Sequence, residues 1–276
     1  MERSLLERQQ EIYDWYAKEP RFLSKTYLDS IPWHEVRNHE IKPELIGVMY
    51  YMRDVEKLTD VYFAELQKTP TGKNAPIQAF MERWRTEESL HGDLMNRFLE
   101  EAGYPSDEKW FDKVKASIPF SNRLHTAVTQ PLLTIGFGRD FSAVHMTWGA
   151  INEYSTMNGY SRLREMARHP VLDRMLDGIM REESRHAQYY WRTAKTMLDD
   201  SPYRQKLARF FIDRFWTPVG EGSKPRRDTA MVVRTLFGGD EGLRKFDGSV
   251  SSIIRRLPGF EDCSTVTDVT ADFAAA

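Results

Sequence analysis

Hydrophobic and polar positions follow a helical period along most of the chain. Apolar residues recur three and four positions apart over long stretches, and no run of alternating β-branched residues indicates a strand. Glycine and proline separate these periodic stretches. The predicted helices cover residues 3–18, 43–66, 75–102, 121–135, 139–168, 171–199 and 202–216, followed by one or two short helices to about residue 256. The pattern predicts an all-α protein.

Breaker residues and composition divide the chain into three parts. Residues 1–216 contain all the long predicted helices and are expected to form a helical bundle. Residues 217–261 begin with a loop rich in glycine, proline and charge, and are expected to be a C-terminal helical extension packed on the same domain. Residues 262–276 are small and polar, and we expect them to be a loose tail.

Composition narrows the class of protein. A net charge of −2 over 276 residues argues against a general nucleic-acid-binding protein. No apolar run is long enough to span a membrane, and the N-terminal stretch lacks an apolar signal core. Cys263 is the single cysteine, so an internal disulfide and an iron–sulfur cluster are both excluded. We therefore expect a soluble cytoplasmic protein.

Two Glu-x-x-His elements constrain function more than any other feature. They are Glu88-Ser-Leu-His91 and Glu183-Ser-Arg-His186, and each is preceded by a further glutamate on a long predicted helix. A lone glutamate in an apolar helical stretch comes before each element: Glu56 lies 32 residues before Glu88, and Glu153 lies 30 residues before Glu183. These near-equal offsets are typical of two helix hairpins of similar size.

Four carboxylates and two imidazoles form the ligand list of a carboxylate-bridged di-iron site in a ferritin-like bundle. Helix positions i and i+3 lie on one face, so Glu and His at that spacing can reach one metal ion. Iron accepts both ligand types, and the lack of thiolates argues against zinc or clusters. Glu87 and Glu182, four residues before each histidine, could also ligate on spacing alone. The alternative is that all these residues are ordinary polar pairs on solvated helix faces.

Four segments resemble the soluble acyl-carrier-protein desaturases. Residues 84–97, with Trp-Arg-Thr-Glu-Glu-Ser-Leu-His-Gly-Asp, resemble that family's Trp-(x)-Ala-Glu-Glu-Asn-Arg-His-Gly-Asp stretch. Residues 181–187 resemble its Asp-Glu-Lys-Arg-His helix and residues 151–160 its Gln-Glu-Arg-Ala-Thr helix. Residues 56–62 resemble its Glu-Asp-Asn-Leu-Pro-Ser-Tyr segment. The resemblance covers about residues 45–200. It implies a ferritin-like four-helix bundle core with additional helices.

The resemblance also implies a set of functional residues. By position, the ligands of two iron ions are Glu56, Glu88, His91, Glu153, Glu183 and His186. Thr156 falls where the family keeps a threonine beside the oxygen-binding side of the metals, where a hydroxyl can assist proton delivery. Its alternative role is a helix threonine bonded to a backbone carbonyl. Glu182 takes the place of a family aspartate that orients a ligating imidazole. Trp33 could stand in for the family's electron-path tryptophan, or be a buried core indole.

The implied activity is O2-dependent desaturation of an acyl chain carried as a thioester on acyl carrier protein. No flavin, nicotinamide or cluster motif is present, so electrons must come from outside, and the resemblance implies a ferredoxin-type donor. It also implies a homodimer. Four basic residues of the 202–216 helix could contact an acidic carrier protein or ferredoxin: Arg204, Lys206, Arg209 and Arg214.

Three alternatives remain open at this point. A related tailoring hydroxylase or N-oxygenase often has a seventh protein ligand, for which His145 is a poor candidate. A ferritin- or rubrerythrin-like iron-handling protein has nearly the same ligands, but the 62 residues from His91 to Glu153 are long for a simple four-helix unit. A helical interaction protein without metal would have no reason to keep all six ligand positions filled.

Overall fold

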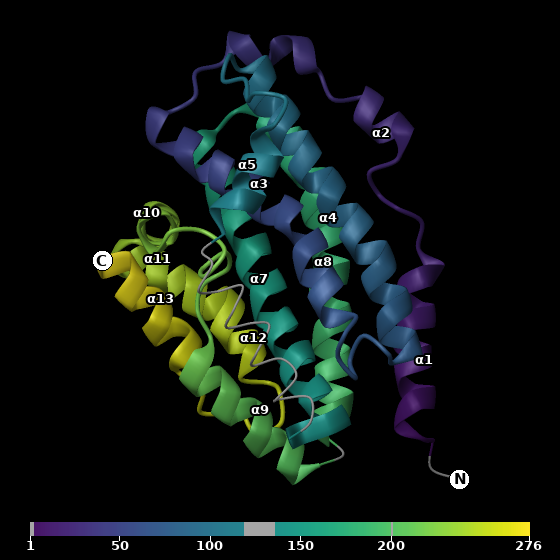
Figure 1. Cartoon of the computed structure of the whole chain (residues 1–276). Helices are drawn as coiled ribbons and strands as arrows, with labels where there is room; N and C mark the ends of the chain where they lie inside the picture. Colours follow the sequence, from purple (N-terminus) through teal and green to yellow (C-terminus); the bar gives the residue numbers. More distant parts are fainter. Residues whose placement is uncertain (1–2, 119–135, 200) are drawn as a thin grey trace.

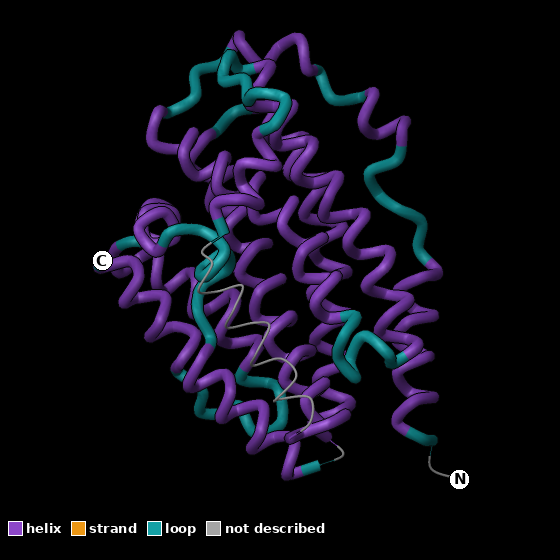
Figure 2. Tube along the Cα trace, viewed as in Figure 1, coloured by secondary structure: helices purple, strands orange, loops and turns teal. Residues whose placement is uncertain are grey.

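The computed structural model describes residues 3–118, 136–199 and 201–276, and almost all of the regular structure in these ranges is helical (Figures 1 and 2). An isolated bridge between Glu221 and Lys224 is the only β pairing in the described ranges. The all-α prediction is therefore confirmed. The predicted helix at residues 121–135 lies outside the described residues.

Four long helices form the bundle: α3 (Pro43–Leu66), α4 (Ala75–Glu101), α7 (Phe141–Ala167) and α8 (Pro170–Asp199). Helix α3 packs along α4 and α7 packs along α8, as two hairpins. Helix α1 (Leu5–Lys18) covers α4 and α8 from outside (Figure 1). Shorter elements at the bundle end are α2 (Lys25–Asp29), the 3-10 helix Trp33–Asn38, and α5 (Trp110–Ser117).

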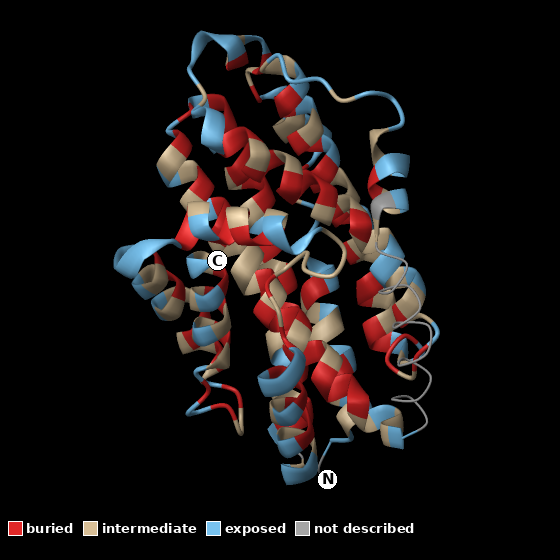
Figure 3. Ribbon diagram, turned by 60° about the vertical axis from the view of Figure 1, so that its left-hand side comes forward, coloured by how far each residue is buried: buried red, intermediate tan, exposed pale blue. Residues whose placement is uncertain are grey.

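Local signals place the ends of the bundle helices. Pro43 stands in the first turn of α3, where its missing N–H costs no hydrogen bond. The side chain of Asn74 accepts from the backbone N–H of Ile77 and caps α4. Arg168, in the left-handed region with φ 49°, ends α7 directly before His169 and Pro170. Buried residues then line the inward faces of the bundle helices (Figure 3).

The C-terminal helices pack beside α3 and α7. They are α9 (Pro202–Phe215), α10 (Arg226–Phe237), α11 (Gly239–Phe246), a π-helical segment (Asp247–Ser251), α12 (Ser252–Ile254) and α13 (Thr265–Ala275). Helix α10 contacts α3, α7 and α13, and α9 contacts α7. Among the described helices, none combines the length and the apolar content that crossing a bilayer requires.

The prediction of a loose tail at residues 262–276 is wrong. Residues Thr265–Ala275 form α13, which packs on α10 and buries Val266, Thr270 and Phe273. A short helix rich in threonine and valine has low intrinsic helix propensity. Tertiary packing of its apolar side stabilises it instead.

Candidate metal centre

The inward faces of α3, α4, α7 and α8 bring the six predicted ligands together. Their ligand atoms form two groups, and within each group all atoms lie within 4.8 Å of one another. One group is Glu56, Glu88, His91 and Glu183; the other is Glu88, Glu153, Glu183 and His186. Glu88 and Glu183 belong to both groups. Each group therefore combines one imidazole, one carboxylate of its own and two shared carboxylates.

The six side chains are buried, and parts of them lack hydrogen-bond partners. Oε1 of Glu88, Oε2 of Glu183 and Nδ1 of His186 are buried without a partner of hydrogen-bond geometry among the described residues, although Nδ1 of His186 lies 2.8 Å from Oε1 of Glu88 as an ion pair. Buried charges are normally paired or bound to metal, because leaving them uncompensated is costly. Two divalent cations would provide the missing partners. The donor set of carboxylate and imidazole fits iron.

The outer nitrogen of each imidazole is held by a glutamate from the opposite helix. Nε2 of His186 on α8 lies 2.7 Å from Oε2 of Glu87 on α4. Nε2 of His91 on α4 lies 3.1 Å from Oε2 of Glu182 on α8. A carboxylate only accepts, so each Nε2 carries its proton and each Nδ1 points at the cluster. Glu87 and Glu182, which spacing alone left as possible ligands, thus lie on the far side of the rings.

Glu87 is itself oriented by α1 and by its own helix. The Tyr16 hydroxyl donates to Oε2 of Glu87 at 2.7 Å, and Nε of Arg83 donates to Oε1 at 2.8 Å. The backbone N–H of Leu23 donates to Oε1 of Glu182 at 3.0 Å. The sequence pattern predicted neither the contact of Tyr16 with the cluster nor the role of Glu87. The repeated Glu-Glu pair before each Ser-x-His was a signal that both first glutamates have the same role.

The unshared carboxylates are also held by side chains from neighbouring helices. The Tyr160 hydroxyl donates to Oε1 of Glu56, and Nε1 of Trp84 donates to Oε1 of Glu153 at 2.9 Å. Both donors are buried. Each of these carboxylates therefore has one oxygen occupied by a donor, which fixes its direction relative to the shared pair.

Burial strongly perturbs the titration of the cluster. Burial raises the pKa of Glu56 and of Glu153 well above the ordinary value of 4.5, and neighbouring carboxylates add to the effect. Burial alone would lower the pKa of His91 and of His186, but the surrounding carboxylates outweigh it and raise both pKa values well above 6.5. Glu87 behaves oppositely: burial would raise its pKa, but His186 and Tyr16 lower it.

The metal-free protein is expected to lose stability as the pH rises above the mildly acidic range. A carboxyl with a raised pKa destabilises the fold once the pH exceeds 4.5, and an imidazole with a raised pKa stabilises it below 6.5 and stops doing so at higher pH. Thermal unfolding in a chelator should show a Tm lower by several degrees at about pH 9 than at about pH 6. An equal or higher Tm at the alkaline pH would contradict this prediction.

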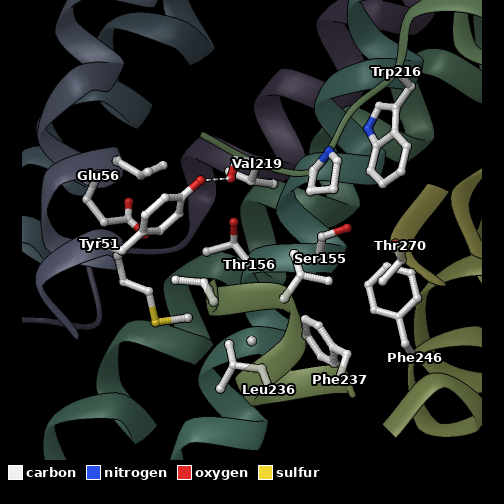
Figure 4. A pocket seen from close by; sticks show the side chains of 16 residues that line it. Tyr51, Glu56, Ser155, Thr156, Trp216, Val219, Leu236, Phe237, Phe246 and Thr270 are labelled. Atoms are coloured by element: carbon white, nitrogen blue, oxygen red, sulfur yellow. Dashed lines mark hydrogen bonds between the residues drawn. The ribbon is translucent and has the colours of Figure 1, made fainter. Parts of the chain in front are cut away.

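Thr156 and Glu56 border an apolar pocket beside the cluster. Thr156 lies on α7, one turn after Glu153, and Glu56 reaches the pocket from α3 (Figure 4). The pocket holds about 570 Å³ of empty space including its open mouth. Thr156 therefore lines the same apolar pocket as the ligand candidate Glu56. The neighbouring Ser155, in contrast, bonds back to the carbonyl of Ile151.

Four other residues singled out in the sequence make contacts with neighbouring side chains or backbone groups outside the ligand cluster. His145 pairs with the Thr71 hydroxyl at 2.7 Å through Nδ1 and belongs to neither ligand group. The Trp33 indole donates to the carbonyl of Leu28 and is buried, as expected of a core indole. Of the basic residues on α9, Arg204 and Arg209 form ion pairs with acidic residues: Asp140 for the first, Asp213 and Asp262 for the second. The basic face is therefore partly neutralised.

Comparison with known proteins gives one match. A family described as fatty acid desaturase matches residues 60–210 through its family model. The matched region contains five of the six predicted ligands and Thr156, and it leaves out Glu56 and everything after residue 210, which includes the end of α9. No curated protein and no solved structure matches the chain.

Proposed function

Because the chain belongs to the fatty acid desaturase family, we propose that its buried cluster holds two iron ions and that the protein oxidises an acyl chain with O2. One observation carries this proposal: two ligand groups share Glu88 and Glu183. Shared carboxylates are the defining feature of carboxylate-bridged di-iron bundles. The buried atoms of Glu88, Glu183 and His186 that make no hydrogen bond of good geometry support the same conclusion.

Glu56, Glu88, His91, Glu153, Glu183 and His186 would hold the irons. When bound, the irons supply the electron transfer to O2 that oxidation of an unactivated C–H bond requires. The protein keeps the ligands in place through Tyr160 and Trp84, and through the cross-paired Glu87 and Glu182. In this proposal the Thr156 hydroxyl, which lines the pocket, passes a proton between the pocket and the cluster.

The apolar pocket is the proposed site of the acyl chain. Its lining is aliphatic and aromatic apart from a few polar groups, and Glu56 joins it to the ligand cluster (Figure 4). We propose acyl carrier protein as the carrier and a ferredoxin-type protein as electron donor, acting on a homodimer. Lys206 and Arg214 are the exposed basic residues of α9 that remain for an acidic partner.

Iron content and product analysis test the proposal together. After reconstitution with ferrous iron, we expect about two irons per chain and an optical spectrum of coupled ferric ions. With reduced ferredoxin, O2 and acyl-carrier-protein thioesters, mass spectrometry should show an acyl product lacking two hydrogens. Zinc alone, or no metal, would refute the metal centre. Two irons with peroxide consumption and no acyl product would identify an iron-handling protein, and an alcohol product would identify a hydroxylase.

Removal of the Tyr16 hydroxyl is expected to weaken iron binding without unfolding the protein. Tyr16→Phe deletes the donor to Glu87, which orients His186, while the ring still packs against Phe80 and Tyr189. Loss of such an outer contact typically lowers metal affinity about tenfold. Titration with cobalt(II), followed by its visible absorption, measures the affinity. Tyr189→Phe is the matched control, since its hydroxyl donates to the carbonyl of Pro76 and not to the cluster.

A further inference from the structure

The walls of the apolar pocket come from two parts of the chain. Glu56 and Thr156 lie on the side of α3 and α7, next to the candidate metal centre. Nine of the sixteen lining residues follow residue 210 and so lie beyond the region that matches the family. Phe246 and Thr270 stand across the pocket from Glu56 (Figure 4). The far wall is therefore built by the C-terminal helices.

The far wall is fixed to the bundle through the π-helical segment that begins directly after Phe246. Nδ2 of Asn158 on α7 donates to Oγ of Ser249 in this segment at 2.6 Å. On the other side, the Thr267 hydroxyl of α13 donates to Oδ1 of Asp247 at 2.6 Å. Such π-helical turns are rare and occur frequently at functional sites. These bonds hold the end of α11 at a set distance from α7.

The ring of Phe246 is itself held in place. It packs edge-on against Phe237 of α10, with ring centroids 5.0 Å apart, and the residue is only 2% exposed. An aromatic ring in this arrangement is a stiff barrier. An apolar chain that lay in the pocket beside Glu56 would meet the ring at the opposite wall (Figure 4).

We propose that Phe246 is a specificity-determining residue that stops the acyl chain, so that the C-terminal helices select its length. The proposal rests on the proposed function, because it takes the pocket as the acyl site. Every methylene that fits before the ring adds apolar contact, and every further one meets the ring. Binding should then strengthen about fourfold per carbon up to an optimum length and fall beyond it.

A series of saturated fatty acids, from octanoate to stearate, tests the proposal by calorimetric titration of the full metal-free chain. Phe246→Ala should move the optimum to longer acids, with at least about a tenfold gain for an acid two carbons beyond the wild-type optimum. Phe246→Leu should give a smaller shift in the same direction, and this variant tests the proposal if the alanine variant does not fold. An unchanged optimum in both folded variants would overturn the proposal, as would failure of every acid to bind the wild type.

Phe260→Ala is the matched control. Phe260 is fully buried in the same C-terminal part but does not line the pocket, so its loss should lower stability and leave the length optimum unchanged. An equal shift in this variant would show general loosening and overturn the role of Phe246. Because the titration uses metal-free protein, the result is independent of iron content. If the optimum shifts but the protein binds no iron, only the proposed function is refuted, and the role of Phe246 in selecting chain length stands.

Discussion

Replacing Glu183 with alanine is expected to reduce bound iron from about two per chain to nearly none and to remove turnover. Glu183 is in both ligand groups, so its loss takes a carboxylate from each metal at once. The helices should stay folded, because Glu183 lies in the middle of α8 and its hydrogen bond goes to His91 within the cluster, and because alanine favours helix. Iron analysis after reconstitution, with circular dichroism, measures both outcomes.

Glu56→Ala provides the comparison for that experiment. Glu56 belongs to one group only, so this variant should retain about one iron per chain while also losing turnover. Glu82→Ala, on the exposed side of α4, should change neither iron content nor turnover. Retention of both irons by the Glu183 variant would contradict the assignment of the shared carboxylates. Loss of both irons in the Glu56 variant would show that the two sites fill only together.

Replacing Gly149 with valine is expected to destabilise the fold by about 3 kcal/mol. A Cβ atom at Gly149 of α7 would lie 2.3 Å from two ring carbons of Tyr190 on α8, far inside van der Waals contact. That ring is fully buried and packs edge-on against Trp84, so it has little room to move. Chemical denaturation of the metal-free variant and the wild type measures the difference in free energy of unfolding.

The same substitution should also affect the candidate metal centre. Displacement of Tyr190 shifts Trp84, whose indole N–H donates to Glu153, so iron binding should weaken even under conditions where the variant is folded. Gly248→Ala is the matched control: nothing lies within 4 Å of its Cβ position, and its effect on stability should be within about 0.5 kcal/mol. Wild-type stability in the Gly149 variant would mean that α7 and α8 are less closely packed than described.

The sequence was most informative where spacing along one helix decides the geometry. Glu88 and His91, or Glu183 and His186, must share a face of their helix whatever the rest of the chain does. Apolar periodicity put those faces inward, and the two hairpins then brought the ligand candidates together as expected. Whether they bind iron stays a prediction. The long helices were also predictable from local sequence, because apolar periodicity marks their length and breaker or capping residues mark their ends.

Contacts between segments distant in the chain could not be predicted in this way. Tyr16 meets Glu87 across 71 residues and Tyr160 meets Glu56 across 104, and neither pairing leaves a local pattern. Helix α13 could not be predicted from its local sequence, because its intrinsic helix propensity is low and its stability comes from packing on α10. The pocket could not be predicted from the sequence for both of these reasons. Its far wall combines Phe246 and Thr270, which are distant in the chain and come from separate C-terminal helices.

The two hydrogen bonds that His186 donates to Glu87 and His91 donates to Glu182 also set the register of α4 against α8. Both bonds run between these two helices in opposite senses: His186 donates from α8 to α4, and His91 donates from α4 to α8. Sliding one helix along the other by a single turn, about 5.4 Å, would break both bonds. The spacing of the two histidines is thus fixed by the chain before any ion arrives. A metal ion that bound here would meet ligands already held in place, and its binding energy would not be spent on assembling them.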